Sequence, residues 1–271
     1  EEKGESSMLQ LGLRLHDAEQ LPIEEQLPIV RKKGYTCVHL ALSKSMKEYP
    51  CGPSALTPGY AHYLKHLFEQ NQMDVAVLGN YLNLAHPDPE VIRVSLEKYY
   101  AHIRFASLLG CGMVGTETGA PNPEYKYCPE CRTDAALSAF IRNAEQFGVI
   151  LALEPVARHI VWNPRRARTV LDEIGSRNLQ ILFDPVNMLD LDNVDCREEV
   201  FAEAMELLGP DIAMVHLKDF IRVPQGRGNR GDGLYISHEV HKTAEAVPIL
   251  HPGEHGPGKC RLVRGQDESA L

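Results

Sequence analysis

The sequence predicts an α/β protein with the (β/α)8 TIM-barrel fold. Short apolar runs rich in β-branched residues alternate along the chain with longer segments of helical period. Four of these segments close with a glycine shortly before the next apolar run, as helices do before a strand. From the fourth run to the seventh the repeat is roughly 30–37 residues, which matches one β/α unit. A doubly wound sheet is the alternative, but "RLHDAEQLP" after the first run lacks the glycine-rich turn that such a sheet requires.

Each apolar run is expected to be a strand, and each periodic segment a helix. The seven strands are expected at Leu9–Leu15, Cys37–Leu42, Asp74–Leu78, Met113–Thr116, Val149–Leu153, Leu179–Phe183 and Ile212–Val215. The helices are expected between them, at residues 22–34, 58–72, 88–110, 133–148 and 164–175. Several of these segments begin with Pro or Asp and end at Gly, which is the usual asymmetry of helix caps.

The chain is expected to form one TIM-barrel domain over residues 9–271, preceded by disordered residues 1–8. Residues 220–271 depart from the pattern, because they are rich in Gly, Pro and His and have weak hydrophobic periodicity. Two segments are candidates for the eighth strand: "AVPIL", with Glu254 beyond it, and "GLYISHE", with Glu239 at its end. The third alternative is an atypical C-terminal segment that leaves the last β/α unit irregular.

Composition narrows the classes of partner. The chain has 271 residues and a formal net charge of -9, which disfavours binding to nucleic acid or to an anionic membrane. It has no apolar run near the ~18 residues of a membrane span. Its seven cysteines are odd in number and scattered, which favours a cytoplasmic, reducing environment over a disulfide framework. "CPEC" at 128–131 has no second pair, so a solvent-facing or redox-inert pair is favoured over a structural metal.

Three consecutive predicted strands end in residues that bind metals. Glu154 follows the fifth strand, Asp184 the sixth and His216 the seventh. Neighbouring strands lie about 4.8 Å apart, so these side chains can converge on one cation at the carboxyl face of the barrel. Taken singly, an Asp after a strand is often a turn cap and a His is often satisfied by hydrogen bonds. Three such residues at matching positions favour a metal site, and their mixed oxygen and nitrogen donors suit Mn²⁺, Zn²⁺, Co²⁺ or Fe²⁺.

The motifs "LALEPV", "LFDPVN" and "VHLKDF" resemble those of the xylose isomerase-like TIM barrels, the sugar phosphate isomerase/epimerase superfamily. The resemblance extends from about Leu9 to Arg222. It implies that Glu154, Asp184 and His216 bind one divalent metal ion (Mn, Zn, Co, Fe or Mg). In this family a strand-eight Glu is the fourth ligand, which leaves Glu239, Glu254 or none for this chain.

The resemblance also implies roles in substrate chemistry. Glu154 is expected to be the catalytic acid/base as well as a ligand, and Arg222 matches a substrate-binding Arg of the epimerases. Asn187 stands where those enzymes often have a His. The superfamily also contains repair endonucleases, but these use three zinc ions and more His ligands, and this chain is acidic.

The expected function is a metal-dependent sugar or sugar phosphate isomerase/epimerase that moves a proton through a metal-stabilised enediolate. Candidate substrate-binding residues are His86, Glu117, Asn187, Lys218 and Arg222. An inosose-type dehydratase is one alternative, because the same enediolate can expel a hydroxyl group. A non-catalytic sugar-binding barrel is the other, and assembly into a homo-oligomer is left open.

Overall fold

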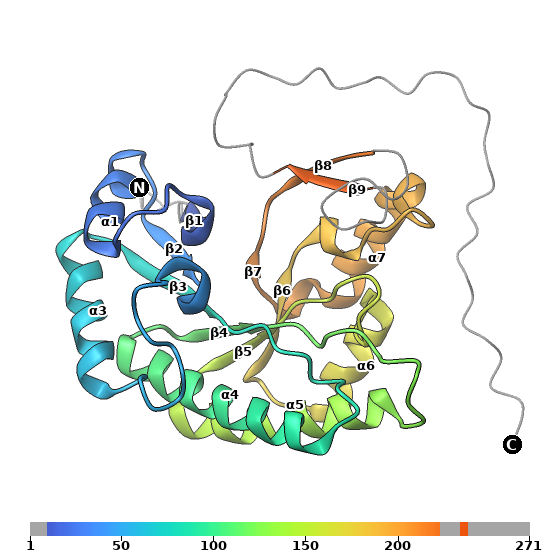
Figure 1. Ribbon diagram of the computed structural model, residues 1–271. Coiled ribbons are helices and arrows are strands. Elements are labelled where there is room, and N and C mark those ends of the chain that lie inside the picture. Colours follow the sequence, from blue (N-terminus) through green and yellow to red (C-terminus); the bar gives the residue numbers. More distant parts are fainter. Residues whose placement is uncertain (1–9, 223–233, 238–271) are drawn as a thin grey trace, which may run out of the picture.

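The computed structural model describes residues 10–222 and 234–237, in which seven parallel strands form a curled half-barrel (Figure 1). The strands follow one another around the sheet in sequence order, and each pairs in parallel with the next. They are β1 Gly12–Arg14, β2 Cys37–Leu40, β3 Asp74–Gly79, β4 Met113–Thr116, β5 Ile150–Leu153, β6 Leu179–Phe183 and β7 Ile212–Val215. All seven predicted strands and the TIM-barrel class are therefore confirmed.

Helices cover the outer face of this sheet (Figure 1). They are α1 Ile23–Lys32, α2 Leu42–Ser45, α3 Pro58–Gln70, α4 Pro89–Leu109, α5 Pro129–Phe147, α6 Pro164–Ile174 and α7 Arg197–Leu208. The predicted caps are present: Asp88 accepts a hydrogen bond from the Glu90 N–H at the start of α4, and Gly110 ends that helix at a φ of 85°. Short 3-10 segments lie at Leu15–Asp17, Pro185–Met188, Val194–Cys196 and Gly209–Asp211.

Two hydrophobic clusters show which way the strand residues face. The larger one lies between the sheet and the helices. The smaller one contains Val77, Ala152 and Leu182, with Met113 and Met214 packed against it. These five residues come from five successive strands and from no helix, so they fill the interior of the half-barrel. Because side chains alternate along a strand, the residue two positions after each of them also faces the interior.

The C-terminal pairing corrects one expectation. Residues of "GLYISHE" form β9 (Leu234–Ser237), which pairs antiparallel with β8 (Asp219–Arg222) and stands apart from the seven-stranded sheet. The proposal that this segment is the eighth barrel strand is therefore wrong, because it pairs with Asp219–Arg222 in a separate two-stranded sheet. "AVPIL", Glu239, Glu254 and residues 1–8 lie outside the described residues.

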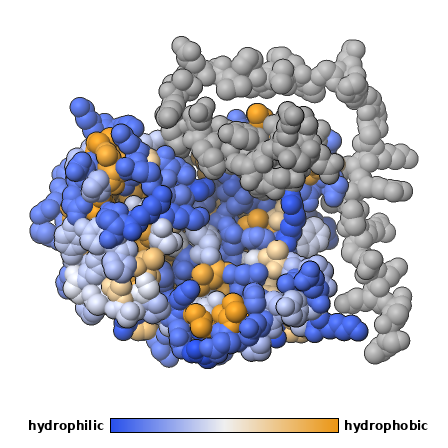
Figure 2. All heavy atoms as spheres, viewed as in Figure 1, coloured by the Kyte–Doolittle hydropathy of each residue, from blue (hydrophilic) through white to orange (hydrophobic). Residues whose placement is uncertain are grey.

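Strand β7 forms one edge of the described sheet. Within residues 10–222 and 234–237 it pairs with β6 alone. Its end is exposed to solvent: the side chain of Val215 is 50% exposed, and that of Leu217, two residues beyond the strand, is 81% exposed. In contrast, every residue of β2 is buried. The visible surface is largely hydrophilic, with small apolar groups (Figure 2).

The "CPEC" segment lies at the start of α5. Both cysteines are exposed, as expected, but Cys128 and Cys131 are joined by a disulfide, which the expectation of an inert pair did not include. Cys128 Sγ also accepts a hydrogen bond from the Cys131 N–H, which caps the helix. None of the described helices is both long and apolar enough to cross a membrane.

Candidate metal centre

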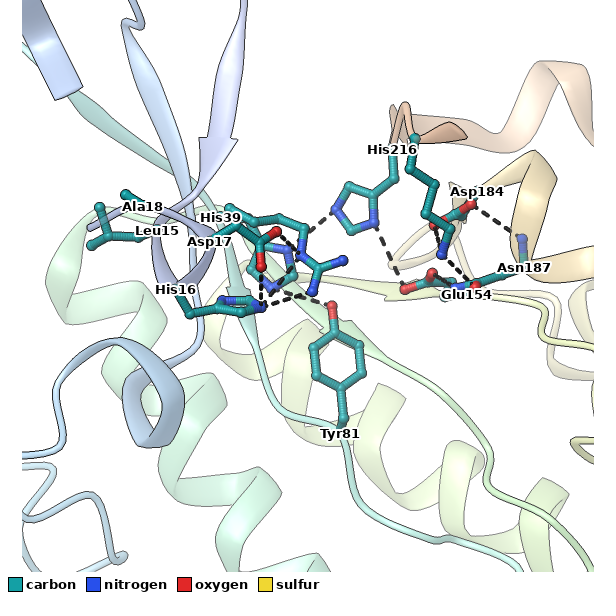
Figure 3. Close-up of polar contacts among 12 residues, drawn as sticks. Leu15, His16, Asp17, Ala18, His39, Tyr81, Glu154, Asp184, Asn187 and His216 are labelled. Atoms are coloured by element: carbon teal, nitrogen blue, oxygen red, sulfur yellow. Dashed lines mark hydrogen bonds and ion pairs between the residues drawn. The ribbon is translucent and has the colours of Figure 1, made fainter. Parts of the chain in front are cut away.

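The carboxyl ends of β5, β6 and β7 bring a Glu, an Asp and a His together (Figure 3). One potential ligand atom from each of Glu154, Asp184 and His216 lies within 4.8 Å of the others. Each residue follows an interior-facing residue of its strand by two positions, so all three point into the half-barrel. Backbone bonds extend the sheet to this level: the Glu154 N–H donates to the Thr116 carbonyl, and the His216 N–H donates to the Phe183 carbonyl.

The two carboxylates of this cluster are withdrawn from water but have polar partners. Glu154 is 3% exposed and Asp184 is 1% exposed. Asn187 Nδ2 donates to Glu154 Oε1 at 2.5 Å, and His216 Nδ1 lies 3.9 Å from Glu154 Oε2. Lys218 Nζ forms an ion pair with Asp184 Oδ2 at 2.8 Å and donates to Asn187 Oδ1. One ammonium, one amide and one imidazole thus partner two buried carboxylates.

Asp184 is both a turn residue and a member of the cluster. Its Oδ1 accepts a hydrogen bond at 3.2 Å from the Asn187 N–H, which caps the 3-10 segment Pro185–Met188. Its Oδ2 faces Lys218. The cap and the ion pair with Lys218 therefore use different oxygen atoms of one carboxylate.

The environment shifts the pKa values of the two carboxyls in opposite directions. Burial alone would raise the pKa of Glu154, but hydrogen bonding and charge from His216, together with Lys218 and Asn187, lower it. Burial raises the pKa of Asp184, although the nearby Lys218 charge opposes this. Glu154 is therefore a carboxylate near neutral pH.

A third carboxyl faces the cluster from β4. Glu117 follows that strand, and its pKa is raised to about 7 by burial and by the negative charge of Glu154. Its Oε2 lies 3.8 Å from Nδ1 of His159, whose pKa is lowered by burial. Glu117 therefore carries a proton in a large fraction of molecules near neutral pH.

The cluster fits a divalent cation in donor type and in charge. Its two carboxylates and one imidazole form the mixed oxygen and nitrogen set that Mn²⁺, Zn²⁺, Co²⁺ and Fe²⁺ accept. Asp184 and Glu154 bring two buried negative charges, and Lys218 offsets only one of them. Burying that surplus charge without a further cation costs several kcal/mol. A bound divalent cation would remove this cost.

A group of residues that the sequence analysis did not select borders the cluster on the β1–β3 side (Figure 3). His39 Nδ1 lies 3.2 Å from His216 Nε2, and the Tyr81 hydroxyl lies 3.2 Å from His39 Nε2. Beyond His39, the His16 ring packs edge-on at a centroid distance of 5.8 Å, and Arg14 Nη2 lies 2.9 Å from His16 Nε2. Burial lowers the pKa of His39 well below its usual value and that of His16 to about 4. In the sequence, the signal for His39 is that it is a single polar residue inside the apolar run "CVHLAL".

The remaining predicted site residues lie in different surroundings. His86 is in the loop before α4, where its Nδ1 accepts from the Asp88 N–H and its carbonyl accepts from Arg132. Arg222 ends β8. Asp219 begins β8, and its Oδ1 accepts from the Phe220 N–H. Among the described residues, the structure brings Glu117, Asn187 and Lys218 to the cluster of Glu154, Asp184 and His216. The substrate-binding roles of all five residues, His86 and Arg222 included, stay predictions.

Comparison with known proteins agrees with the barrel fold described above. A family model for the xylose isomerase-like TIM barrel matches residues 27–249. No curated protein matches the sequence significantly. A D-psicose 3-epimerase structure from Clostridium cellulolyticum H10 superposes with a TM-score of 0.65 at 17% identity, covering 82% of this chain and 77% of that chain.

Two further solved structures share the fold. The IOLI protein with a binding zinc atom gives a TM-score of 0.65 at 16% identity, covering 80% of this chain and 75% of that chain. The probable 3-DHS dehydratase AsbF from Bacillus anthracis gives a TM-score of 0.61 at 13% identity, covering 78% of this chain and 74% of that chain. At such identities the likeness shows the fold alone.

Proposed function

Because the chain belongs to the xylose isomerase-like TIM-barrel family, we propose that it is a divalent-metal-dependent isomerase or epimerase of sugars or sugar phosphates. The observation that carries the proposal is the convergence of Glu154, Asp184 and His216 within 4.8 Å. These three residues would hold one cation, drawn from Mn²⁺, Zn²⁺, Co²⁺, Fe²⁺ or Mg²⁺. Epimerases among the proteins of similar fold support the class of reaction.

Glu154 is the proposed acid/base of this reaction. When bound, the metal ion supplies polarisation of the substrate's carbonyl and adjacent hydroxyl, which acidifies the C–H between them. Glu154 is suited to take this proton because its surroundings keep it unprotonated. Removing the proton leaves an enediolate on the substrate. Returning it to the carbonyl carbon, while the hydroxyl proton moves to the former carbonyl oxygen, gives an isomer. Delivery of a proton to the opposite face of the original carbon by a second group gives an epimer.

Lys218, Asn187 and Glu117 are proposed to bind the substrate's oxygen atoms. Lys218 Nζ and Asn187 Nδ2 already donate to the carboxylates of the cluster, so they lie within one hydrogen bond of the reacting groups. An ammonium at this position stabilises negative charge that develops on a substrate oxygen. Glu117 can donate or accept, because its pKa of about 7 populates both of its forms.

The protonated form of Glu117 favours one second candidate, a dehydratase. A carboxylic acid facing the site can protonate a departing β-hydroxyl, so that the enediolate loses water instead of regaining a proton. One protein of similar fold is described as a probable dehydratase. Product analysis separates the two reactions, because dehydration lowers the product mass by one water and isomerisation leaves the mass unchanged.

Exchange of substrate hydrogen with solvent tests the proposal. The Mn²⁺-loaded protein is incubated in D2O with a panel of ketoses, inososes and their phosphates, and deuterium incorporation is followed by NMR and mass spectrometry. We expect incorporation at the carbon next to the carbonyl for at least one compound, and loss of at least ~100-fold of that rate in Glu154→Gln. Glu198→Gln, an identical change at an exposed side chain of α7, is the control. Exchange that persists in Glu154→Gln would contradict the assigned role.

A further inference from the structure

The two ring nitrogens of His216 face different partners. Nδ1 lies on the carboxylate side, 3.9 Å from Glu154 Oε2, while Nε2 lies 3.2 Å from Nδ1 of His39. Only Nδ1 is therefore placed to join Glu154 and Asp184 around a cation. A histidine ligand must offer a lone pair to the metal, so the proton of a neutral His216 ring has to reside on Nε2.

The two imidazoles are in hydrogen-bond contact, because His216 Nε2 lies 3.2 Å from His39 Nδ1. Their planes differ by 9° and their centroids lie 5.1 Å apart. Parallel rings at this centroid distance are offset from one another rather than directly face to face. A hydrogen bond at this position requires one protonated and one unprotonated nitrogen.

The surroundings of His39 hold its ring in place. It is 6% exposed, and its Nε2 lies 3.2 Å from the Tyr81 hydroxyl. A Cβ atom at Gly79 would lie only 2.3 Å from this Nε2, so the absence of a side chain at that position of β3 makes room for the ring. If Nε2 carries the His39 proton and donates to Tyr81, Nδ1 is left as an acceptor.

We propose that His39 is a positioning residue that accepts a hydrogen bond from the His216 Nε2–H and thereby reserves His216 Nδ1 for the cation. Metal-ligating histidines usually donate their second ring N–H to a carboxylate, a backbone carbonyl or water, and here a second histidine serves as the acceptor. The part that concerns the cation rests on the proposed function, whereas the hydrogen bond itself does not.

Two variants of nearly equal size separate positioning from packing. In His39→Asn, the amide oxygen takes the place of Nδ1 and can still accept from His216. In His39→Leu, the acceptor is lost while the volume is similar. Affinity for Mn²⁺, measured by calorimetry, is expected to fall 10–100-fold in His39→Leu and to stay within about threefold of wild type in His39→Asn. Equal losses in the two variants, or no loss in either, would overturn the proposal.

The metal-free protein provides the second readout. With ¹⁵N-labelled histidine, NMR of the wild-type protein reports which ring nitrogens carry protons. We expect a proton on His216 Nε2, an unprotonated His39 Nδ1 and a proton on His39 Nε2. A proton on His39 Nδ1 would overturn the proposal. Because this measurement needs no metal, failure of Mn²⁺ binding would count against the proposed function and would leave this spectrum to decide the role of His39.

Discussion

At the scale of single residues, the site depends on how its buried charges are matched. Glu154 and Asp184 are almost fully buried, and the Lys218 ammonium forms an ion pair with Asp184. An ion pair of this kind is costly to form but more costly to break, because the remaining charge is left without a partner. A divalent cation bound here would therefore contribute to the same charge balance as Lys218.

Substitution of Lys218 tests this balance. In chelator-treated protein, Lys218→Met is expected to lower the free energy of unfolding by about 2–4 kcal/mol, because Asp184 loses its cation. Saturating Mn²⁺ is expected to recover most of this loss, since a bound cation supplies the missing charge. Urea unfolding with and without Mn²⁺ measures both values. Equal losses under the two conditions would show that the ammonium and the metal do not share this role.

Glu117 makes stability depend on pH in a predictable direction. Burial and the charge of Glu154 raise its pKa from the ordinary 4.5 to about 7. Its contribution to stability is therefore full below pH 4.5 and is lost as the pH rises through about 7, because the folded state keeps a proton that the unfolded chain releases.

The matched variant is Glu117→Gln, which cannot titrate. Between about pH 4 and pH 8, we expect its free energy of unfolding to change relative to wild type by up to about 3 kcal/mol in favour of the variant. Urea unfolding of both proteins in the presence of a chelator gives this difference at each pH. A difference that does not vary with pH would mean that Glu117 has an ordinary pKa in the folded protein.

At the scale of elements, local patterns were enough to place most strands and helices. Caps such as Asp88 and Gly110 occur in the sequence at the positions where α4 begins and ends. Helix α7 was missed because it starts after Cys196 without a side-chain cap and continues into Gly209 in right-handed helical conformation. His39 was not predicted as a site residue because it lies within a strand, whereas the predicted site residues follow the ends of later strands. Its role depends on contact with His216, 177 positions away, and no local pattern encodes such a contact.

Strand β3 offers a test of how elements hold the site. Gly79→Ala would place a Cβ 2.3 Å from His39 Nε2 and 2.8 Å from the Tyr81 ring, and both side chains are confined. We expect a loss of about 1–3 kcal/mol in the free energy of unfolding and weaker Mn²⁺ binding. Gly112→Ala is the control, because a Cβ there meets no atom within 4 Å. Similar stability and metal affinity in the two variants would argue against tight packing around His39.

At the scale of the whole molecule, the fold explains why the site residues converge. Parallel strands in sequence order bring residues 154, 184 and 216 to one face, although about thirty residues separate each from the next. The spacing of the motifs predicted this convergence. It did not reveal that Lys218 and Asn187 complete the charge and hydrogen-bond network, since those contacts depend on side-chain directions in three dimensions.

The central claim is that this face binds one divalent cation through Glu154, Asp184 and His216. The test is calorimetric titration of Mn²⁺ into chelator-stripped protein, followed by elemental analysis of the metal-loaded protein. Mn²⁺ is chosen because it prefers oxygen and nitrogen donors to cysteine thiolates. We expect one ion per chain in the wild type and in Glu198→Gln, and a loss of at least ~100-fold in affinity in the double variant Glu154→Gln/Asp184→Asn. Absence of binding in the wild type, or equal binding in the double variant, would contradict it.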